Sequence, residues 1–151
     1  RGLRVDSLDQ LTYLTAIIKE TMRLHPVAAA IPLITTRETE IDGLEIPQGT
    51  GLDLFFLAAG RNSQMYPNPN QFKPERWLTP RQEQPLMLGF SLGAHSCVGN
   101  HLALLEATVM LALLLKQFNW ELVNGNKSLT ELDQNLTIFP RDRMPVRFSL
   151  R

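Results

Sequence analysis

Residues 90–103 read Phe-Ser-Leu-Gly-Ala-His-Ser-Cys-Val-Gly-Asn-His-Leu-Ala, and this stretch decides how the rest of the sequence is interpreted. It places the only cysteine, Cys97, at the end of a glycine-punctuated loop, directly before an apolar segment with helical periodicity. A helix N-terminus favours a thiolate over a thiol, because its dipole and free N–H groups stabilise negative charge. Gly93 and Gly99 remove side chains where a flat cofactor would approach the backbone. The stretch predicts a ligand at Cys97, and a buried structural cysteine is the alternative.

The stretch resembles the haem-binding signature of the cytochrome P-450 family, Phe-x-x-Gly-x-x-x-Cys-x-Gly. Phe90, Gly93, Cys97 and Gly99 occupy its fixed positions, and Ala103 matches a small residue one helical turn further on. The resemblance implies haem b, iron protoporphyrin IX, with Cys97 as the axial iron ligand. The residues expected to contact this cofactor are Phe90, Gly93, His95, Cys97, Val98, Gly99 and Ala103.

Two positions of the loop depart from the family pattern. His95 stands where many members carry arginine, although histidine is a familiar variant in bacterial-type members. Either side chain can donate a hydrogen bond to a haem propionate, and we expect His95 to do so. Ser91 replaces the usual second glycine, which we interpret as a mild departure.

A second pattern is Glu20-Thr21-Met22-Arg23, in which a spacing of three places Glu20 and Arg23 on one helix face. Taken alone, such a pair is typical of a solvated salt bridge worth a few tenths of a kcal/mol. The family, however, carries Glu-x-x-Arg here and a third partner in a Pro-Glu-Arg-aromatic segment, which resembles Pro74-Glu75-Arg76-Trp77. The resemblance therefore implies a buried structural ion-pair cluster of Glu20, Arg23 and Arg76.

The fold class that we expect is mainly α with small β-sheets (α+β), as in the C-terminal part of the cytochrome P-450 fold. The resemblance spans Ser7 to Arg147, and we interpret residues 1–151 as one partial domain long enough to bury a real core. Its expected segments are a helix at 7–25, a β region at 27–58, a meander at 61–88, the cysteine loop at 89–99, a long helix at 99–119 and a C-terminal hairpin at 130–150. Asp42-Gly43 predicts a tight hairpin turn.

Two stretches are expected to face a substrate. The first is Val27 to Leu33, in which we single out Val27, Ala28, Ala29 and Ile31, and the second is Asn135 to Ile138. Ordinary core and turn residues are the alternative for both. The oxygen-activating helix of the family, with its acid–threonine pair, would precede the Glu-x-x-Arg helix, and the sequence contains no such helix.

Composition restricts the partners. Lys plus Arg number 15 and Asp plus Glu number 15, which argues against nucleic acid. No apolar run approaches the ~20 residues of a membrane span. The resemblance implies an organic small-molecule substrate and an electron donor: a ferredoxin, a flavodoxin or a reductase. We expect a cytoplasmic, bacterial-type protein, and a membrane anchor on a preceding segment stays open.

The leading interpretation is a haem-binding oxidoreductase fragment. By resemblance, its parent enzyme would activate O2 at a thiolate-ligated haem and insert one oxygen atom into an organic substrate. The alternatives are a thiolate peroxygenase or isomerase, which needs no redox partner, and a non-catalytic haem-binding remnant or sensor.

Overall fold

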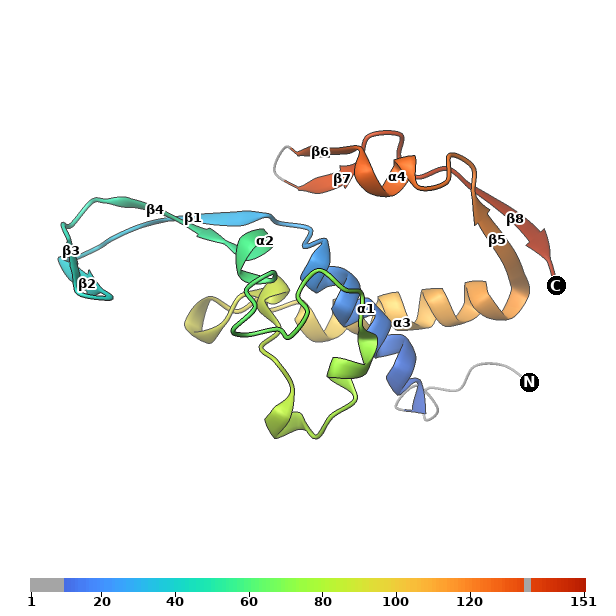
Figure 1. The fold of residues 1–151 in the computed structure, drawn as a ribbon, viewed down its shortest axis with the longest axis horizontal. Coiled ribbons are helices and arrows are strands. Elements are labelled where there is room, and N and C mark those ends of the chain that lie inside the picture. Colours follow the sequence, from blue (N-terminus) through green and yellow to red (C-terminus); the bar gives the residue numbers. More distant parts are fainter. Residues whose placement is uncertain (1–9, 135–136) are drawn as a thin grey trace.

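The computed structural model describes residues 10–134 and 137–151 (Figure 1). Its α-helices are α1 (Thr12–Leu24), α2 (Phe56–Ala59), α3 (Asn100–Gln117) and α4 (Lys127–Thr130). Its strands are β1 (Ala30–Ile34), β2 (Thr39–Ile41), β3 (Leu44–Ile46), β4 (Gly51–Phe55), β5 (Phe118–Leu122), β6 (Leu132–Gln134), β7 (Ile138–Pro140) and β8 (Val146–Leu150). Short 3-10 turns lie at η2 (Pro74–Trp77), η3 (Arg81–Glu83), η4 (Leu88–Phe90) and η5 (Gly93–His95). Helices with small antiparallel sheets confirm the predicted α+β class.

The helix α1 ends where the sequence predicts, because His25 precedes a proline and adopts a non-helical conformation. Its start differs from the prediction. The α-helix begins at Thr12, and the N-cap residue Leu11 makes no side-chain capping bond. Residues 7–9, the first of the predicted helix, lie outside the described residues. Along its length α1 packs against α3 and η2, and this places it at the centre of the molecule (Figure 1).

Two antiparallel pairs follow α1. The hairpin of β2 and β3 is confirmed: its turn residues Asp42 and Gly43 have φ values of 51° and 79°, which only such turn residues adopt readily. The other pair joins β1 to β4, with Pro32 opposite Asp53. The predicted β region at 27–58 ends in a helical turn, since β4 leads directly into α2 at Phe56.

The C-terminal region differs from the prediction in two ways. The long helix ends at Gln117, and Phe118 starts β5 because it pairs with Leu150 of β8. The predicted single hairpin at 130–150 is wrong in its pairing. Only β6 and β7 form a hairpin, while β8 pairs with β5 across the intervening residues. In chain order, the two strands of the β6–β7 sheet therefore lie between the two strands of the β5–β8 sheet.

The surface of the molecule is large for its mass. It exposes 11139 Å², whereas a compact 17 kDa monomer exposes about 7,800 Å² by the usual scaling. The expected domain-sized core is absent from the described residues, and the cluster of buried apolar side chains is limited to Ala16, Tyr66 and Trp77. Helix α3 is apolar around its whole circumference, yet it buries only Thr108. A helix of this kind normally lies inside a larger structure.

Candidate functional site

The carboxylate of Glu20 is the centre of a buried polar cluster between α1 and the 61–88 meander. Its side chain is fully buried and accepts five hydrogen bonds. Arg23 donates two, from Nε to Oε2 at 2.9 Å and from Nη2 to Oε1 at 2.8 Å. The backbone N–H of Lys73 and the Nε of Arg76 donate to Oε1 at 2.9 and 3.1 Å, and the indole of Trp77 donates to Oε2 at 2.9 Å. Together they connect α1 to η2.

These contacts keep the carboxyl ionised. Burial alone raises the pKa of Glu20, but hydrogen bonds from Arg23, the Lys73 N–H and Trp77, with the charge of Arg23, lower it to about 2. A buried charge is tolerated only when it is paired and hydrogen-bonded, and both conditions hold here. The cluster contains two guanidinium groups for one carboxylate, and the atom Nη2 of Arg76 is buried without a partner among the described residues.

Arg23 also joins the cluster to the rest of the meander. Its Nη1 donates to the carbonyls of Gly60 and Pro69, its Nη2 donates to that of Gln71, and its guanidinium lies 5.1 Å from the Tyr66 ring centroid. Gly60 is required at its position, because a Cβ there would lie 2.5 Å from the backbone oxygen of Arg23.

The structure thus brings together Glu20, Arg23 and Arg76, which the sequence analysis grouped, and adds members that it missed. The sequence offers one signal for Trp77, an aromatic residue directly after Pro-Glu-Arg. For Lys73 and Gly60 there is none, since their contacts are made by the backbone.

The cysteine loop follows the meander and is open to solvent. Cys97 is exposed, and its backbone N–H donates to the carbonyl of Phe90 at 2.7 Å. The Ser96 N–H donates to Gly93 at 3.1 Å, and the Asn100 N–H to Cys97 at 3.3 Å, so Cys97 is three residues before the first residue of α3. His95, Val98 and Ala103 are exposed, while Phe90 and Gly99 are half-buried. The loop therefore fixes its backbone and leaves the thiol accessible.

Comparison with known proteins identifies the framework. The sequence model described as Cytochrome P-450 matches residues 1–148. The chain belongs to the cytochrome P-450 family. It is 39% identical over 128 residues to a flavonoid 3'-monooxygenase of Petunia hybrida, covering 78% of this chain and 25% of that protein. It is 33% identical over 128 residues to a cyclooctat-9-en-7-ol 5-monooxygenase of Streptomyces melanosporofaciens, covering 83% and 28%.

Solved structures of the family have the same arrangement. The heme domain of a cytochrome P-450DA mutant superimposes with a TM-score of 0.90 at 25% identity, covering all of this chain and 33% of that one. A retinoic acid-bound cyanobacterial CYP120A1 gives a TM-score of 0.86 at 25% identity, covering 99% and 35%. The chain thus spans about a quarter of the curated relatives it matches and about a third of these solved chains.

Membership of the cytochrome P-450 family implies a haem, and the cysteine loop is compatible with one. A Cβ at Gly93 would meet nothing within 4 Å, and one at Gly99 would meet only the Cys97 sulfur, at 3.8 Å. The side chains of Leu92, Val98 and Leu102 are exposed around the thiol. The loop presents an exposed sulfur atom within an uncovered apolar surface, which is compatible with a flat apolar macrocycle.

Ser91 is a larger departure from the P-450 pattern than the sequence analysis assumed. Its φ is 59° and its ψ is −178°, a region that is essentially reserved for glycine. The glycine that the family usually places here matches this conformation, and serine adopts it at a cost.

The two stretches expected to face substrate are joined by a hydrogen bond. The Ile138 N–H donates to the carbonyl of Val27 at 2.8 Å. Val27 is exposed and Ala28 and Ile31 are half-buried, but Ala29 is buried and its side chain is closed to a ligand in this structure. Asn135, at the start of the second stretch, lies outside the described residues.

Among the described residues, no helix is long and apolar enough to cross a bilayer. The cytoplasmic location inferred from the sequence stays a prediction.

Proposed function

We propose that this chain is the haem-ligand portion of a cytochrome P-450 monooxygenase, in which Cys97 supplies the thiolate ligand to the iron of haem b. The observation that carries the proposal is the position of Cys97, the only cysteine of the chain. Its side chain is exposed, while its backbone N–H is fixed to Phe90 at 2.7 Å. A sulfur atom on a fixed backbone next to a helix N-terminus is correctly oriented before the cofactor binds.

The neighbouring residues of the loop have distinct roles in this proposal. Gly93 and Gly99 leave room for a ring system to approach the backbone, and Val98 and Ala103 offer it apolar contacts. His95 is exposed and donates a hydrogen bond to a propionate. The cluster of Glu20, Arg23 and Arg76 has a structural role, because it holds the meander against α1 and so supports the loop that follows.

When bound, the haem supplies the activation of O2 and the insertion of one oxygen atom into an organic substrate. The chain contributes the surface on which that substrate is held, through Val27, Ala28 and Ile31. Electrons would come from a ferredoxin, a flavodoxin or a reductase. These assignments concern the whole protein. The relatives are three to four times longer than the part of them that this chain matches.

The test is spectroscopic. The chain is loaded with haem, reduced and exposed to CO, and the position of the Soret band is recorded. A strongly red-shifted band is expected for a thiolate–iron–CO complex. Cys97→Ser should abolish this shift, His95→Ala should weaken haem retention without changing the ligand, and the neighbouring Ser96→Ala serves as the matched control.

Two results would contradict the proposal. One is a Soret position typical of histidine ligation, which His95 or His101 could provide. The other is the absence of haem binding by a chain whose far-ultraviolet spectrum shows that it is folded.

A further inference from the structure

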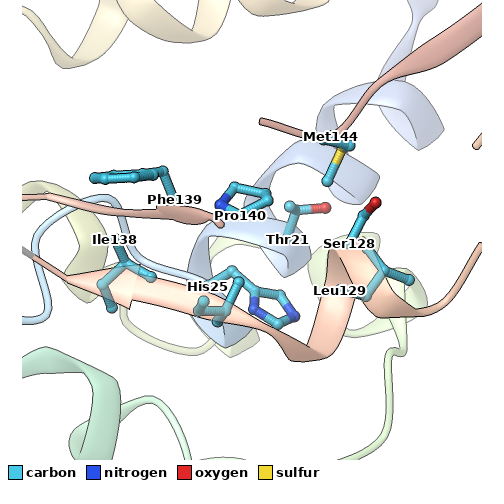
Figure 2. A pocket seen from close by; sticks show the side chains of 9 residues that line it. Thr21, His25, Ser128, Leu129, Ile138, Phe139, Pro140 and Met144 are labelled. Atoms are coloured by element: carbon cyan, nitrogen blue, oxygen red, sulfur yellow. The ribbon is translucent and has the colours of Figure 1, made fainter. Parts of the chain in front are cut away.

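Two adjoining cavities form a groove between the end of α1 and the C-terminal elements α4, β6 and β7. One has a volume of about 230 Å³ and the other of about 560 Å³. Both are lined by His25, Leu129, Leu132 and Ile138, so they share one wall, which we call the His25 wall. Figure 2 shows the smaller cavity, with the imidazole of His25 turned toward Leu129 and with Ile138 and Phe139 along the strands. Apolar side chains dominate both parts.

The charge in this groove has one sign. Of the residues that the structure describes, Arg61 is the only one with a permanently charged side chain that lines either cavity, and none of their carboxylates lines them. Its Nη1 donates to the carbonyl of Leu57 at 3.2 Å. Within residues 10–134 and 137–151, no carboxylate forms a salt bridge with it. Ser128, which lines the smaller cavity, donates to Asp142 at 2.6 Å, and Asp142 also accepts a hydrogen bond from Asn124 at 2.7 Å.

His25 adds a neutral polar group beside this cation. Burial lowers the pKa of its imidazole, and the charge of Arg61 lowers it further. At pH 7 the ring is therefore uncharged and has one N–H donor to offer. The hydroxyl of Thr21, which also lines the smaller cavity, is directed to the Ile17 carbonyl at 2.9 Å. His25 lines both cavities and Arg61 lines the larger one, and the charge of Arg61 acts on the imidazole, so these two donors lie close together.

We propose that this groove binds an aliphatic monocarboxylate, with its carboxylate at Arg61 and His25 and its hydrocarbon chain along Leu129, Leu132 and Ile138. A guanidinium offers a fork of donors that matches the two oxygens of a carboxylate. The apolar wall gains free energy in proportion to the hydrocarbon surface that it removes from water. A neutral chain would leave Arg61 without a counter-charge, and a cationic one would be repelled by it.

The site is separate from the haem-ligand loop. Of the described residues, none from 88–103 and none of Val27, Ala28, Ala29 and Ile31 lines either cavity. Ile138, the last residue of the second stretch expected to face a substrate, lines both. The inference does not rest on the proposed function, and its test needs no haem.

The test uses the full 151-residue chain labelled with ¹⁵N, titrated with octanoate and, separately, with 1-octanol. Octanoate should bind at least tenfold more tightly than octanol and shift the amide signals of Leu132 and Ile138. Arg61→Gln should reduce octanoate affinity to the level of octanol, whereas Arg37→Gln, an exposed arginine outside the groove, should leave it unchanged. Saturation with octanoate, but not with octanol, should raise the pKa of His25, because the carboxylate offsets the charge of Arg61.

Equal affinities for octanoate and octanol on the unmodified chain would overturn the proposal, whatever the behaviour of the variants. So would octanoate binding that survives Arg61→Gln, or amide shifts confined to residues outside the groove. Failure of the haem experiment would leave these outcomes untouched, so the two proposals can fail independently.

Discussion

The Glu20 cluster and the Cys97 loop differ in how many of the interactions of their central side chain the chain itself supplies. The Glu20 carboxylate is inaccessible to solvent and accepts five hydrogen bonds from four residues of its own chain. The Cys97 side chain is exposed, and only its backbone is held. This contrast indicates that the cluster serves folding, because the chain itself satisfies the Glu20 carboxylate, and it agrees with the proposal that the loop holds a cofactor.

The largest difference in stability is expected when the central side chain of each region is removed in turn. Glu20→Ala leaves the guanidiniums of Arg23 and Arg76 buried without their carboxylate, so we expect a loss of about 3–5 kcal/mol in the free energy of unfolding. Cys97→Ser should change it by less than about 0.5 kcal/mol, because the side chain is exposed. Urea unfolding followed by circular dichroism measures both. Equal effects would show that the two regions do not differ in their contribution to folding.

Acid should weaken the Glu20 cluster. The pKa of Glu20 is about 2 in the folded chain against an ordinary 4.5. A lowered pKa contributes stability that is fully present above pH 4.5 and is lost as the pH falls through 2. The difference corresponds to roughly 3 kcal/mol, at about 1.4 kcal/mol per pKa unit.

Urea unfolding at pH values from 7 to 2 measures this loss. Glu20→Gln should be less stable at pH 7 and should lack the additional decline between pH 4.5 and 2. A decline of the same size in Glu20→Gln would assign the acid sensitivity to other carboxylates.

Substitutions at two glycines should distinguish the Glu20 cluster from the Cys97 loop further. Gly60→Ala places a Cβ 2.5 Å from the Arg23 carbonyl oxygen, so we expect a cost of about 1–3 kcal/mol from the forced backbone shift. Gly99→Ala meets only the Cys97 sulfur at 3.8 Å, an ordinary contact. It should leave urea unfolding almost unchanged and weaken haem binding, which an absorbance titration detects. Reversal of this order would contradict the assignment of Gly60 to folding and of Gly99 to the cofactor.

The smallest expected effect concerns Ser91. Because its backbone occupies a region reserved for glycine, Ser91→Gly should raise the free energy of unfolding by about 1 kcal/mol. Ser96 has an ordinary extended backbone, with φ of −60° and ψ of 142°, so Ser96→Gly should lower it by about 0.5 kcal/mol. Thermal unfolding of the two variants side by side decides the matter. No gain in Ser91→Gly would mean that the loop carries no strain at this position.

The sequence predicted different amounts of detail for the Cys97 loop and the Glu20 cluster. Fixed spacing around a single cysteine was enough to predict the loop, and the Glu-x-x-Arg and Pro-Glu-Arg-Trp segments predicted the three charged members of the cluster. Spacing could not reveal that the Trp77 indole and the Lys73 N–H complete the shell of Glu20, because those contacts depend on how η2 packs on α1.

Long-range strand pairing was also beyond the sequence pattern. The predicted hairpin at 130–150 included Val146–Leu150, but the pattern specified no partner outside it, and Phe118 belonged to the predicted long helix. The pairing of β5 with β8 spans the whole β6–β7 hairpin. The small size of the core could not be predicted for a similar reason. Composition predicts the apolar content of a chain, and it does not say which apolar faces the chain itself can cover.

The most direct test of the central claim is X-ray absorption at the iron edge of the haem-loaded chain. Our account predicts a sulfur atom bonded directly to iron in the unmodified chain and in Ser96→Ala, and its loss in Cys97→Ser. An iron bound only by nitrogen and oxygen in the unmodified chain would contradict the assignment of Cys97 as the haem ligand.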